Sequence, residues 1–349
     1  MRVKQIKIPF YVTPEIERFV YVYLVDAEKA LIMIDSGVAG SERMIEEMIT
    51  EMGRKPGDLE AILLTHAHPD HIGTANYFRE TYGAEVYASE GERPWIEDID
   101  LQFEQRPIPN FYHLAGKSTP VDHVVKDRDC IRISDSIQIE VIGTPGHSFD
   151  DLSYRVGDCV FLGDAVPVRG DIPIFIDSAN TGHTLQKIEA LSDVQVFYPA
   201  WDRAYSFEMM KEKITDARKV IDELESCVNE AEYRTELSEL VSYVCEKLQM
   251  PAWRQNLLFA RTVASCRRRL TNQMISRIAM EQSAADLNAK ATDFLQETNV
   301  IVKSEVGPKA RKYYREPIAC NLVSYGNNIV ASVRDEYRGI VEQLSLIHI

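Results

Sequence analysis

The stretch Leu64-Thr-His-Ala-His-Pro-Asp-His-Ile-Gly73 decides how this chain of 349 residues is interpreted. It places His66, His68, Asp70 and His71 within six positions. Three imidazoles and a carboxylate so close together are hard to satisfy except around a metal ion, because both groups are standard zinc ligands. The alternative, in which Asp70 only caps the start of a helix, accounts for one of the four side chains. The stretch therefore predicts a metal centre.

The residues around this stretch predict a strand that runs into a helix. Residues 61–64 form a short apolar run typical of a buried strand, and residues 72–82 have the spacing of an amphipathic helix. The histidines are then expected on the connecting turn, above a sheet edge. His66 and His68 lie two apart in an extended segment and point the same way. Asp70 and His71 face a neighbouring position, so one turn offers ligands to two adjacent ions.

Two further strand ends supply candidate ligands. Ile139-Glu-Val-Ile-Gly-Thr-Pro-Gly-His147 runs from an apolar strand into a Pro-Gly turn that presents His147. Cys159-Val-Phe-Leu-Gly-Asp164 is a second apolar strand, and its glycine allows Asp164 to approach closely. Either residue alone is typical of an ordinary turn. Because both follow strands in order behind the first cluster, we interpret them as parts of one site.

Together, Thr-His-Ala-His-Pro-Asp-His, Thr-Pro-Gly-His and Leu-Gly-Asp resemble the motifs of the metallo-β-lactamase superfamily, in its glyoxalase II-like and lactonase-like branch. The resemblance covers residues 1–205. It implies an α/β fold of the αββα type, in which two mixed β-sheets are flanked by helices. It also implies one or two zinc ions as the cofactor, with iron or manganese as alternatives.

The resemblance further implies how the ligands are divided. One ion would be held by His66, His68 and His147, and the second by Asp70 and His71, with Asp164 bridging the two. Residues 32–37, Ile-Met-Ile-Asp-Ser-Gly, match another family signature, in which Asp35 supports the ligand turn from behind. A simple strand-ending turn is the alternative for that segment.

The sequence departs from the family pattern at one ligand. The family usually places a last metal-binding histidine in a turn near the end of the domain, and here Val196-Phe-Tyr-Pro-Ala-Trp-Asp202 occupies that place. Trp201 stands where the histidine is expected. Asp202, one position later, is the candidate for an oxygen ligand. The sequence therefore predicts a second metal position that is weaker or differently ligated.

A hydrolase follows from such a centre. A bound ion lowers the pKa of its water from about 15.7 to about 7, so that metal-bound hydroxide exists at neutral pH. Asp70 or Asp164 would act as the catalytic carboxylate that orients the hydroxide or accepts its proton. The chain contains no Gly-x-Ser-x-Gly elbow, and the metal mechanism needs no serine nucleophile.

Length and composition narrow the setting. A hydrophobic content of 45% supports a packed core, and no apolar run reaches the about 18 residues of a membrane span. The six cysteines are scattered without CxxC spacing, which favours reduced thiols in the cytoplasm. A net charge of −15 disfavours broad nucleic-acid binding. We expect a small-molecule substrate and no membrane partner, and the sequence leaves a homodimer open.

The pattern becomes helical near residue 205. We expect a helical C-terminal domain over 206–283, with helices near 207–229, 235–247 and 253–270. Residues 284–343 then form an additional segment, expected to begin with a helix and to belong to an incomplete further domain. The last residues, 344–349, resemble translated sequencing-adapter read-through, and we expect a non-native tail there.

The region between residues 247 and 280 holds no acidic residue but carries six arginines: Arg254, Arg261, Arg267, Arg268, Arg269 and Arg277. One interpretation is a charged helix face that pairs with neighbouring acidic helices. The other is a clamp for an anionic ligand such as a coenzyme A phosphate or RNA.

Two segments are candidate pocket walls. Residues 90–128 are rich in aromatic residues and proline with little periodicity, which suits either a lid or an ordinary connecting loop. Residues 171–177 could form the opposite wall. The function predicted from the sequence is hydrolysis of a small thioester, lactone or related ester. The alternatives are a phosphodiesterase or ribonuclease, and a catalytically weak ligand-binding regulatory protein.

Overall fold

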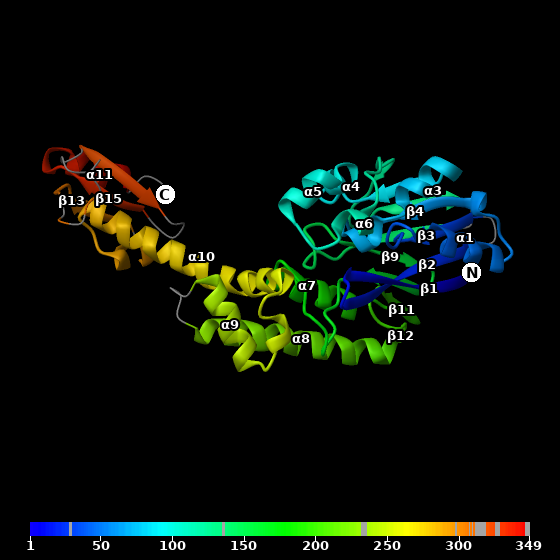
Figure 1. Ribbon diagram of the computed structural model, residues 1–349. Coiled ribbons are helices and arrows are strands. Elements are labelled where there is room, and N and C mark those ends of the chain that lie inside the picture. Colours follow the sequence, from blue (N-terminus) through cyan, green and yellow to red (C-terminus); the bar gives the residue numbers. More distant parts are fainter. Residues whose placement is uncertain are drawn as a thin grey trace. The chain divides into compact units, whose positions relative to one another are not determined.

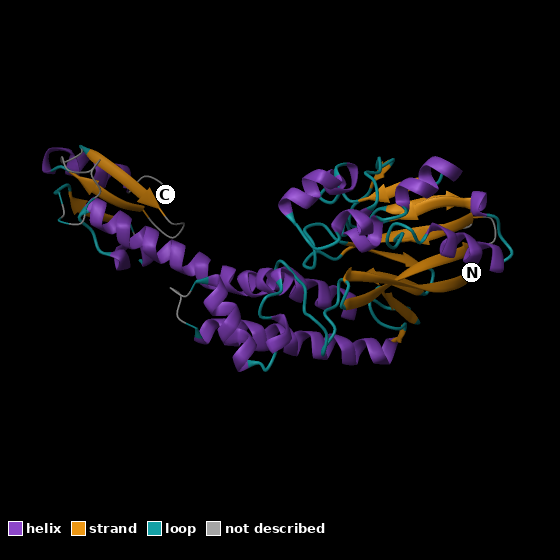
Figure 2. Cartoon of the chain, in the orientation of Figure 1, coloured by secondary structure: helices purple, strands orange, loops and turns teal. Residues whose placement is uncertain are grey.

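The computed structural model describes residues 1–27, 30–134, 137–231, 236–296, 299–306, 308, 310, 319–324 and 329–345. The chain divides into two compact units, Met1–Cys266 and Arg267–Ile349, and each is described by itself. The larger unit is a sandwich of two six-stranded sheets with helices on the outer faces (Figures 1 and 2). This arrangement confirms the αββα architecture that the motifs predict.

The first sheet has the order β1-β2-β3-β4-β5-β6. Its strands are β1 (Arg2–Thr13), β2 (Ile16–Ala27), β3 (Ala30–Ile34), β4 (Leu59–Leu63), β5 (Glu85–Ala88) and β6 (His123–Val124). The strands β1, β2 and β3 are antiparallel, and β3 through β6 run parallel. The parallel half places the ends of β3, β4 and β5 at one edge of the sheet, where ligands commonly bind in α/β folds.

The second sheet has the order β12-β11-β10-β9-β8-β7. Its strands are β7 (Cys130–Ser134), β8 (Ile137–Gly143), β9 (Leu152–Val156), β10 (Cys159–Gly163), β11 (Val196–Pro199) and β12 (Tyr205–Ser206). All neighbours are antiparallel except β10 and β11, which are parallel. The strands predicted before His147 and Asp164 are therefore confirmed as β8 and β10.

Alternation along the strands builds two apolar layers. On β2, Tyr23 and Val25 face the second sheet, where they pack with residues such as Tyr154 and Phe161. The intervening Val22 and Leu24 belong instead to the layer beneath the helices. A strand with both faces buried reads as a continuous apolar run, which is why the central strands carry so few polar residues.

Short helices cover the first sheet: α1 (Glu42–Glu51), α2 (Pro69–Ile72), α3 (Ala75–Tyr82), α4 (Arg93–Glu97), α5 (Ile99–Gln105) and α6 (Phe111–Ala115), with a 3-10 turn at Pro56–Asp58. The prediction of a single helix over residues 72–82 is wrong at its N-terminal end. The backbone N–H of Gly73 donates to the Gly37 carbonyl (2.7 Å), and Thr74 donates to the Ser36 carbonyl (2.6 Å), so the helix is interrupted between α2 and α3. Residues 90–128 contain α4–α6, which are too short to show a periodicity.

On the second sheet, α8 (Phe207–Glu230) packs against β11, β12 and α7 (Ser178–Glu189). It is followed by α9 (Leu237–Lys247), a 3-10 turn (Pro251–Trp253) and α10 (Leu257–Leu287). The helical region expected after residue 205 is confirmed, although α10 is much longer than predicted. Position 235, the expected start of the second helix, lies outside the described residues. Within the described part of the chain, every helix is too short or too polar to cross a membrane.

The smaller unit contains a three-stranded sheet of order β13-β15-β14, made of β13 (Val300–Lys303), β14 (Cys320–Ser324) and β15 (Ile329–Val333). Leu287, Phe294 and Val330 lie in its apolar core. A 3-10 turn (Ala291–Leu295) precedes the sheet, and another (Asp335–Tyr337) leads into α11 (Arg338–Ser345). The helix expected to start near 284 is wrong, because α10 ends at Leu287 and a sheet follows. The predicted domain limits stay a prediction, and positions 346–349 lie outside the described residues.

Candidate metal centre

The candidate ligands gather where several strands end at one edge of the sandwich. His66 and His68 follow β4, Asp70 and His71 lie on α2, and Asp164 directly follows β10. Hydrogen bonds join the two sheets here: Leu152 N–H donates to the Thr65 carbonyl (2.9 Å) and the Tyr154 hydroxyl to the Leu64 carbonyl (2.8 Å). The ligand turn is therefore fixed to both sheets before any metal binds.

Four of the predicted ligands form one cluster. Ligand atoms of His66, His68, His147 and Asp164 all lie within 4.8 Å of one another. His147 Nε2 lies 2.9 Å from His68 Nδ1 and 3.3 Å from Asp164 Oδ2. Three of these four side chains are histidines, whose nitrogens suit zinc and other divalent transition metals.

Two more predicted ligands adjoin this cluster. His71 Nε2 lies 3.4 Å from Asp164 Oδ2 and 3.8 Å from Asp70 Oδ2. Asp164 thus faces His71 on one side and His147 on the other. The six side chains expected from the turn and the two strand ends are brought together by the fold.

Unpartnered atoms test whether a metal fits here. His66 Nε2, His71 Nε2, Asp70 Oδ2 and Asp164 Oδ1 are buried and lack a hydrogen-bond partner among the described residues. Buried polar atoms are normally paired, since an unsatisfied one costs about 1–3 kcal/mol. All four are lone-pair donors in a suitable protonation state and converge on one place. The residues present therefore fit a metal ion.

Neighbouring groups orient these ligands. Asp35, in the left-handed region at φ +55°, accepts hydrogen bonds from Thr65 N (2.8 Å) and lies 2.8 Å from His71 Nδ1 through its other oxygen. His147 Nδ1 donates to the Ile174 carbonyl (2.8 Å). When Nδ1 carries the proton, Nε2 keeps its lone pair for a metal. Asp35 thus has the geometry that the family signature implies.

Burial sets the protonation of the cluster. It lowers the pKa of His66, His68 and His147, helped at His66 by the charge of His71, so these imidazoles are neutral at pH 7. For His71, burial acts to lower the pKa, but the charges of Asp164, Asp35 and Asp70 outweigh it and raise the pKa. For Asp164, burial acts to raise the pKa, but the charge of His71 outweighs it and holds the pKa below its usual value. Neutral imidazoles and an ionised carboxylate are the forms that bind metals, so His71 would release a proton on taking up an ion.

Comparison with known proteins agrees with this geometry. The family model described as "Metallo-beta-lactamase superfamily" matches residues 16–197. The chain belongs to this superfamily. A "Probable metallo-hydrolase YqgX" of Bacillus subtilis is 32% identical over 146 residues, which is 41% of this chain and 64% of that protein. An "Exodeoxyribonuclease WalJ" of Streptococcus pneumoniae is 37% identical over 68 residues, 20% of this chain and 24% of that protein.

A solved structure shares the superfamily fold. It is a metallo-beta-lactamase family protein, TTHA1429, from Thermus thermophilus, with a TM-score of 0.59 and 18% identity, and the match covers 78% of this chain and 94% of that one. At that identity the likeness supports the fold alone. Because this chain spans less than two thirds of the B. subtilis relative, its activity is taken up as a proposal below.

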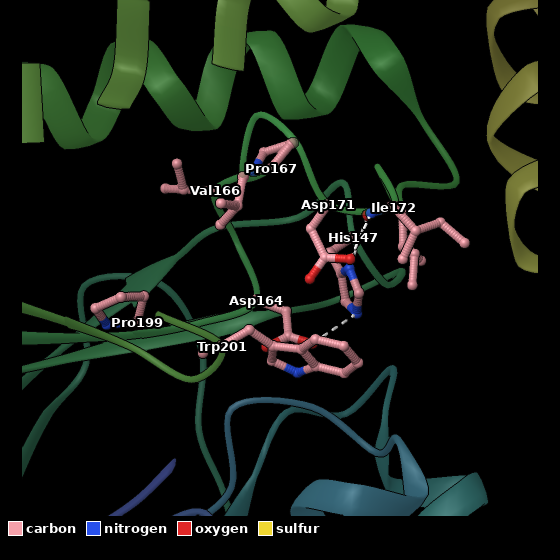
Figure 3. A pocket seen from close by; sticks show the side chains of 11 residues that line it. His147, Asp164, Val166, Pro167, Asp171, Ile172, Pro199 and Trp201 are labelled. Carbon is pink, nitrogen blue, oxygen red and sulfur yellow. Dashed lines mark hydrogen bonds and ion pairs between the residues drawn. The ribbon is translucent and has the colours of Figure 1, made fainter. Parts of the chain in front are cut away.

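The departure from the superfamily pattern is visible in the pocket beside the cluster. His147, Asp164 and Trp201 line an open pocket together with residues 171 and 172, which lie in the segment predicted as a wall (Figure 3). An indole N–H only donates hydrogen bonds, so Trp201 cannot replace a histidine ligand. Its Nε1 is buried without a hydrogen-bond partner among the described residues.

The structure does not bring Asp202 into the cluster, which corrects the ligand role expected for it. Its carboxylate accepts a hydrogen bond from Tyr205 (2.5 Å) and forms an ion pair with Lys213 (3.0 Å). It also accepts a hydrogen bond from Arg203 N (2.7 Å). These partners hold it in place beside α8, and they lower the pKa of Asp202 against the opposing effect of burial.

Glu92, Ser148 and Asp151 support the cluster, and the sequence analysis did not identify them. Glu92 is 2% exposed and accepts hydrogen bonds from Ala67 N (3.0 Å) and the Ser148 hydroxyl (2.5 Å). Asp151 accepts from Ser148 N (2.5 Å). Glu92 thereby ties the turn between His66 and His68 to the loop that follows His147. No local motif marks it, because its partners are remote in sequence.

Proposed function

We propose that this protein is a metal-dependent hydrolase that cleaves a small thioester, lactone or related ester. The observation that carries the proposal is the convergence of buried, unpartnered ligand atoms from His66, Asp70, His71 and Asp164. The resemblance to a protein named as a probable metallo-hydrolase supports the reaction class.

The residues of the cluster have distinct expected tasks. His66, His68 and His147 would hold the main ion, and Asp164 would lie between it and a second position near Asp70 and His71. A divalent ion in this centre supplies Lewis acidity, which polarises the attacked carbonyl and makes water acidic enough to react at neutral pH. Asp70 is suited to take up a proton, because burial raises the pKa of its carboxyl group.

The pocket beside the cluster supports a small ester. Apolar side chains, among them Val166, Pro167, Ile172 and Trp201, line it with few polar groups (Figure 3). An acyl chain would be held by such a wall while its carbonyl lies at the cluster. The partner we propose is accordingly a small molecule, whereas a homodimer stays a prediction.

A phosphodiesterase or nuclease is the second candidate. The segment similar to an exodeoxyribonuclease favours it, although that segment covers only 24% of the nuclease. The net charge of −15 speaks against a nucleic-acid substrate. A third candidate, a ligand-binding regulatory protein with weak catalysis, draws on the tryptophan at position 201. A cytoplasmic location fits the six free cysteines and is part of our proposal.

The test joins metal analysis to a hydrolysis panel. The purified protein is assayed for bound metal and for cleavage of a thioester, a lactone, a phosphodiester and a β-lactam, beside His66→Ala. We expect thioester or lactone cleavage that the variant loses by about a hundredfold or more. Cleavage of the phosphodiester alone would favour the second candidate. Absence of metal, or equal activity of parent and variant, would contradict the hydrolase proposal.

A further inference from the structure

We infer that Arg106 and Arg261 form a binding subsite for a carboxylate or phosphate group of the substrate, beside the metal centre. This inference rests on the proposed function and adds that the substrate carries a negatively charged group. It draws on the positions of the two arginines, on the burial of Arg106, and on the absence of an ion pair to either guanidinium among the described residues.

The first observation is the position of Arg106. The Gln102 side chain donates to the carbonyl of Ala67 (2.6 Å), the residue between His66 and His68. The backbone N–H of Arg106 donates to the Gln102 carbonyl (2.7 Å), one helical turn along α5. Arg106 follows the last residue of α5 with non-helical backbone angles (φ −141°, ψ +68°), and its backbone is tied to the ligand turn through Gln102.

The second observation is that Arg106 is buried without a partner. It is 6% exposed, and among the described residues its guanidinium forms no ion pair or hydrogen bond. Five N–H donors in a buried guanidinium normally find acceptors. The carboxylates whose charges act on Arg106 belong to the ligand cluster or to its support. Asp70 and Asp164 face His71, and Glu92 accepts hydrogen bonds from Ser148 and Ala67 N.

The third observation is a second arginine at the same place. Arg261 of α10 donates through Nη2 to the Gln105 carbonyl (2.8 Å), the residue before Arg106. Thr262, next to it, donates to the Pro173 carbonyl (2.9 Å) and accepts from Phe175 N (3.1 Å), which anchors α10 to the loop that orients His147. Burial and the charge of Arg261 lower the pKa of Arg106 to about 10, against the raising effect of Asp70.

These observations point to an anion. The positive charges of Arg106 and Arg261 repel each other, and a bound metal would add positive charge nearby. A carboxylate or phosphate accepts paired hydrogen bonds from arginine and relieves that repulsion. Of the six arginines in the basic stretch of the sequence, Arg261 is thereby given a role, whereas the side chains of Arg267, Arg268, Arg269 and Arg277 lie outside the described residues.

The binding test uses inorganic phosphate as the probe and the metal-loaded protein. We expect calorimetry to show phosphate affinity reduced at least about 30-fold in Arg106→Gln and about threefold in Arg261→Gln. The control is Arg43→Gln, because the Arg43 side chain is 88% exposed and forms an ion pair with Glu47 on α1. Metal content is measured for every variant, so that loss of metal is not mistaken for loss of the subsite.

A kinetic test separates the subsite from the hydrolase proposal. It compares a neutral thioester with one that carries a terminal carboxylate. We expect Arg106→Gln to raise KM for the charged substrate and to leave the neutral one unchanged, whereas a role in tuning the metal would affect both. If no ester is cleaved but the phosphate result holds, the function fails and the subsite stands. Unchanged phosphate affinity in Arg106→Gln overturns the subsite. If Arg106→Gln does not fold, unchanged phosphate affinity in Arg261→Gln overturns it instead.

Discussion

Replacement of Trp201 by histidine should create the ligand that the second metal position lacks. In this structure Asp70, His71 and Asp164 already face that position, with His71 Nε2 3.4 Å from Asp164 and 3.8 Å from Asp70. Trp201 lines the pocket beside Asp164 but offers only an N–H donor. We expect the parent to retain about one zinc ion per chain after dialysis and Trp201→His to retain about two.

The stability change can be worked from the contacts that Trp201 makes. The substitution removes apolar packing against the core and a cation–π contact with Arg18 at 5.6 Å, the latter worth about 0.5–1 kcal/mol. An imidazole also carries an N–H, so the unpaired indole donor is exchanged and its removal gives no net gain. The metal-free variant should therefore be less stable than the parent by about 1–2 kcal/mol.

With zinc bound, Trp201→His should become more stable than the parent. A ligand that binds only the folded state stabilises it by about 2.7 kcal/mol when its free concentration is 100 times its Kd. Thermal unfolding is measured with and without zinc, together with metal content by elemental analysis. The control is Trp201→Phe, which removes the same N–H and supplies no ligand. Equal stoichiometry in the histidine and phenylalanine variants, or two firmly held ions in the parent, would refute the reasoning.

Three further outcomes follow from the site. Asp35→Ala should weaken zinc binding by about 10–100-fold, because the carboxylate 2.8 Å from His71 Nδ1 is lost. Chelator competition measures the zinc affinity, and an unchanged affinity would show that Asp35 does not support the site. Gly163→Ala should destabilise the fold by about 2 kcal/mol or more in urea unfolding, because this residue has φ +54° and a Cβ would lie 2.5 Å from the Thr65 hydroxyl. A variant as stable as the parent would show that the segments around Gly163 and Thr65 can move apart. Zinc content should be the same at about pH 7.5 and pH 6. Burial lowers the pKa values of the three imidazoles of the main cluster, so protons compete with zinc only at a pH below those lowered values. Loss of zinc near the unperturbed histidine pKa of about 6.5 would contradict this prediction.

Local chemistry allowed the sequence to predict much of the site. Imidazole and carboxylate side chains at the ends of apolar strands have few other ways to be satisfied, so His66, His68, His147 and Asp164 could be grouped without coordinates. The sandwich was predicted from the resemblance of these motifs to the metallo-β-lactamase superfamily, and the continuously apolar strands suit a fold in which strands are buried on both faces. These inferences depend on residue types and on short spacings, which the chain itself contains.

Only the tertiary structure decided which segments remote in sequence are in contact. Glu92 is 25 residues from Ala67 and Arg261 is 156 residues from Gln105, and neither separation leaves a periodic pattern. The tertiary structure also assigned Asp202 to Lys213 rather than to the cluster, since a carboxylate binds whichever cation the fold brings near it. The metal turn is therefore determined by the sequence, whereas the groups that orient it and the charges that face its substrate depend on how the chain folds back on itself.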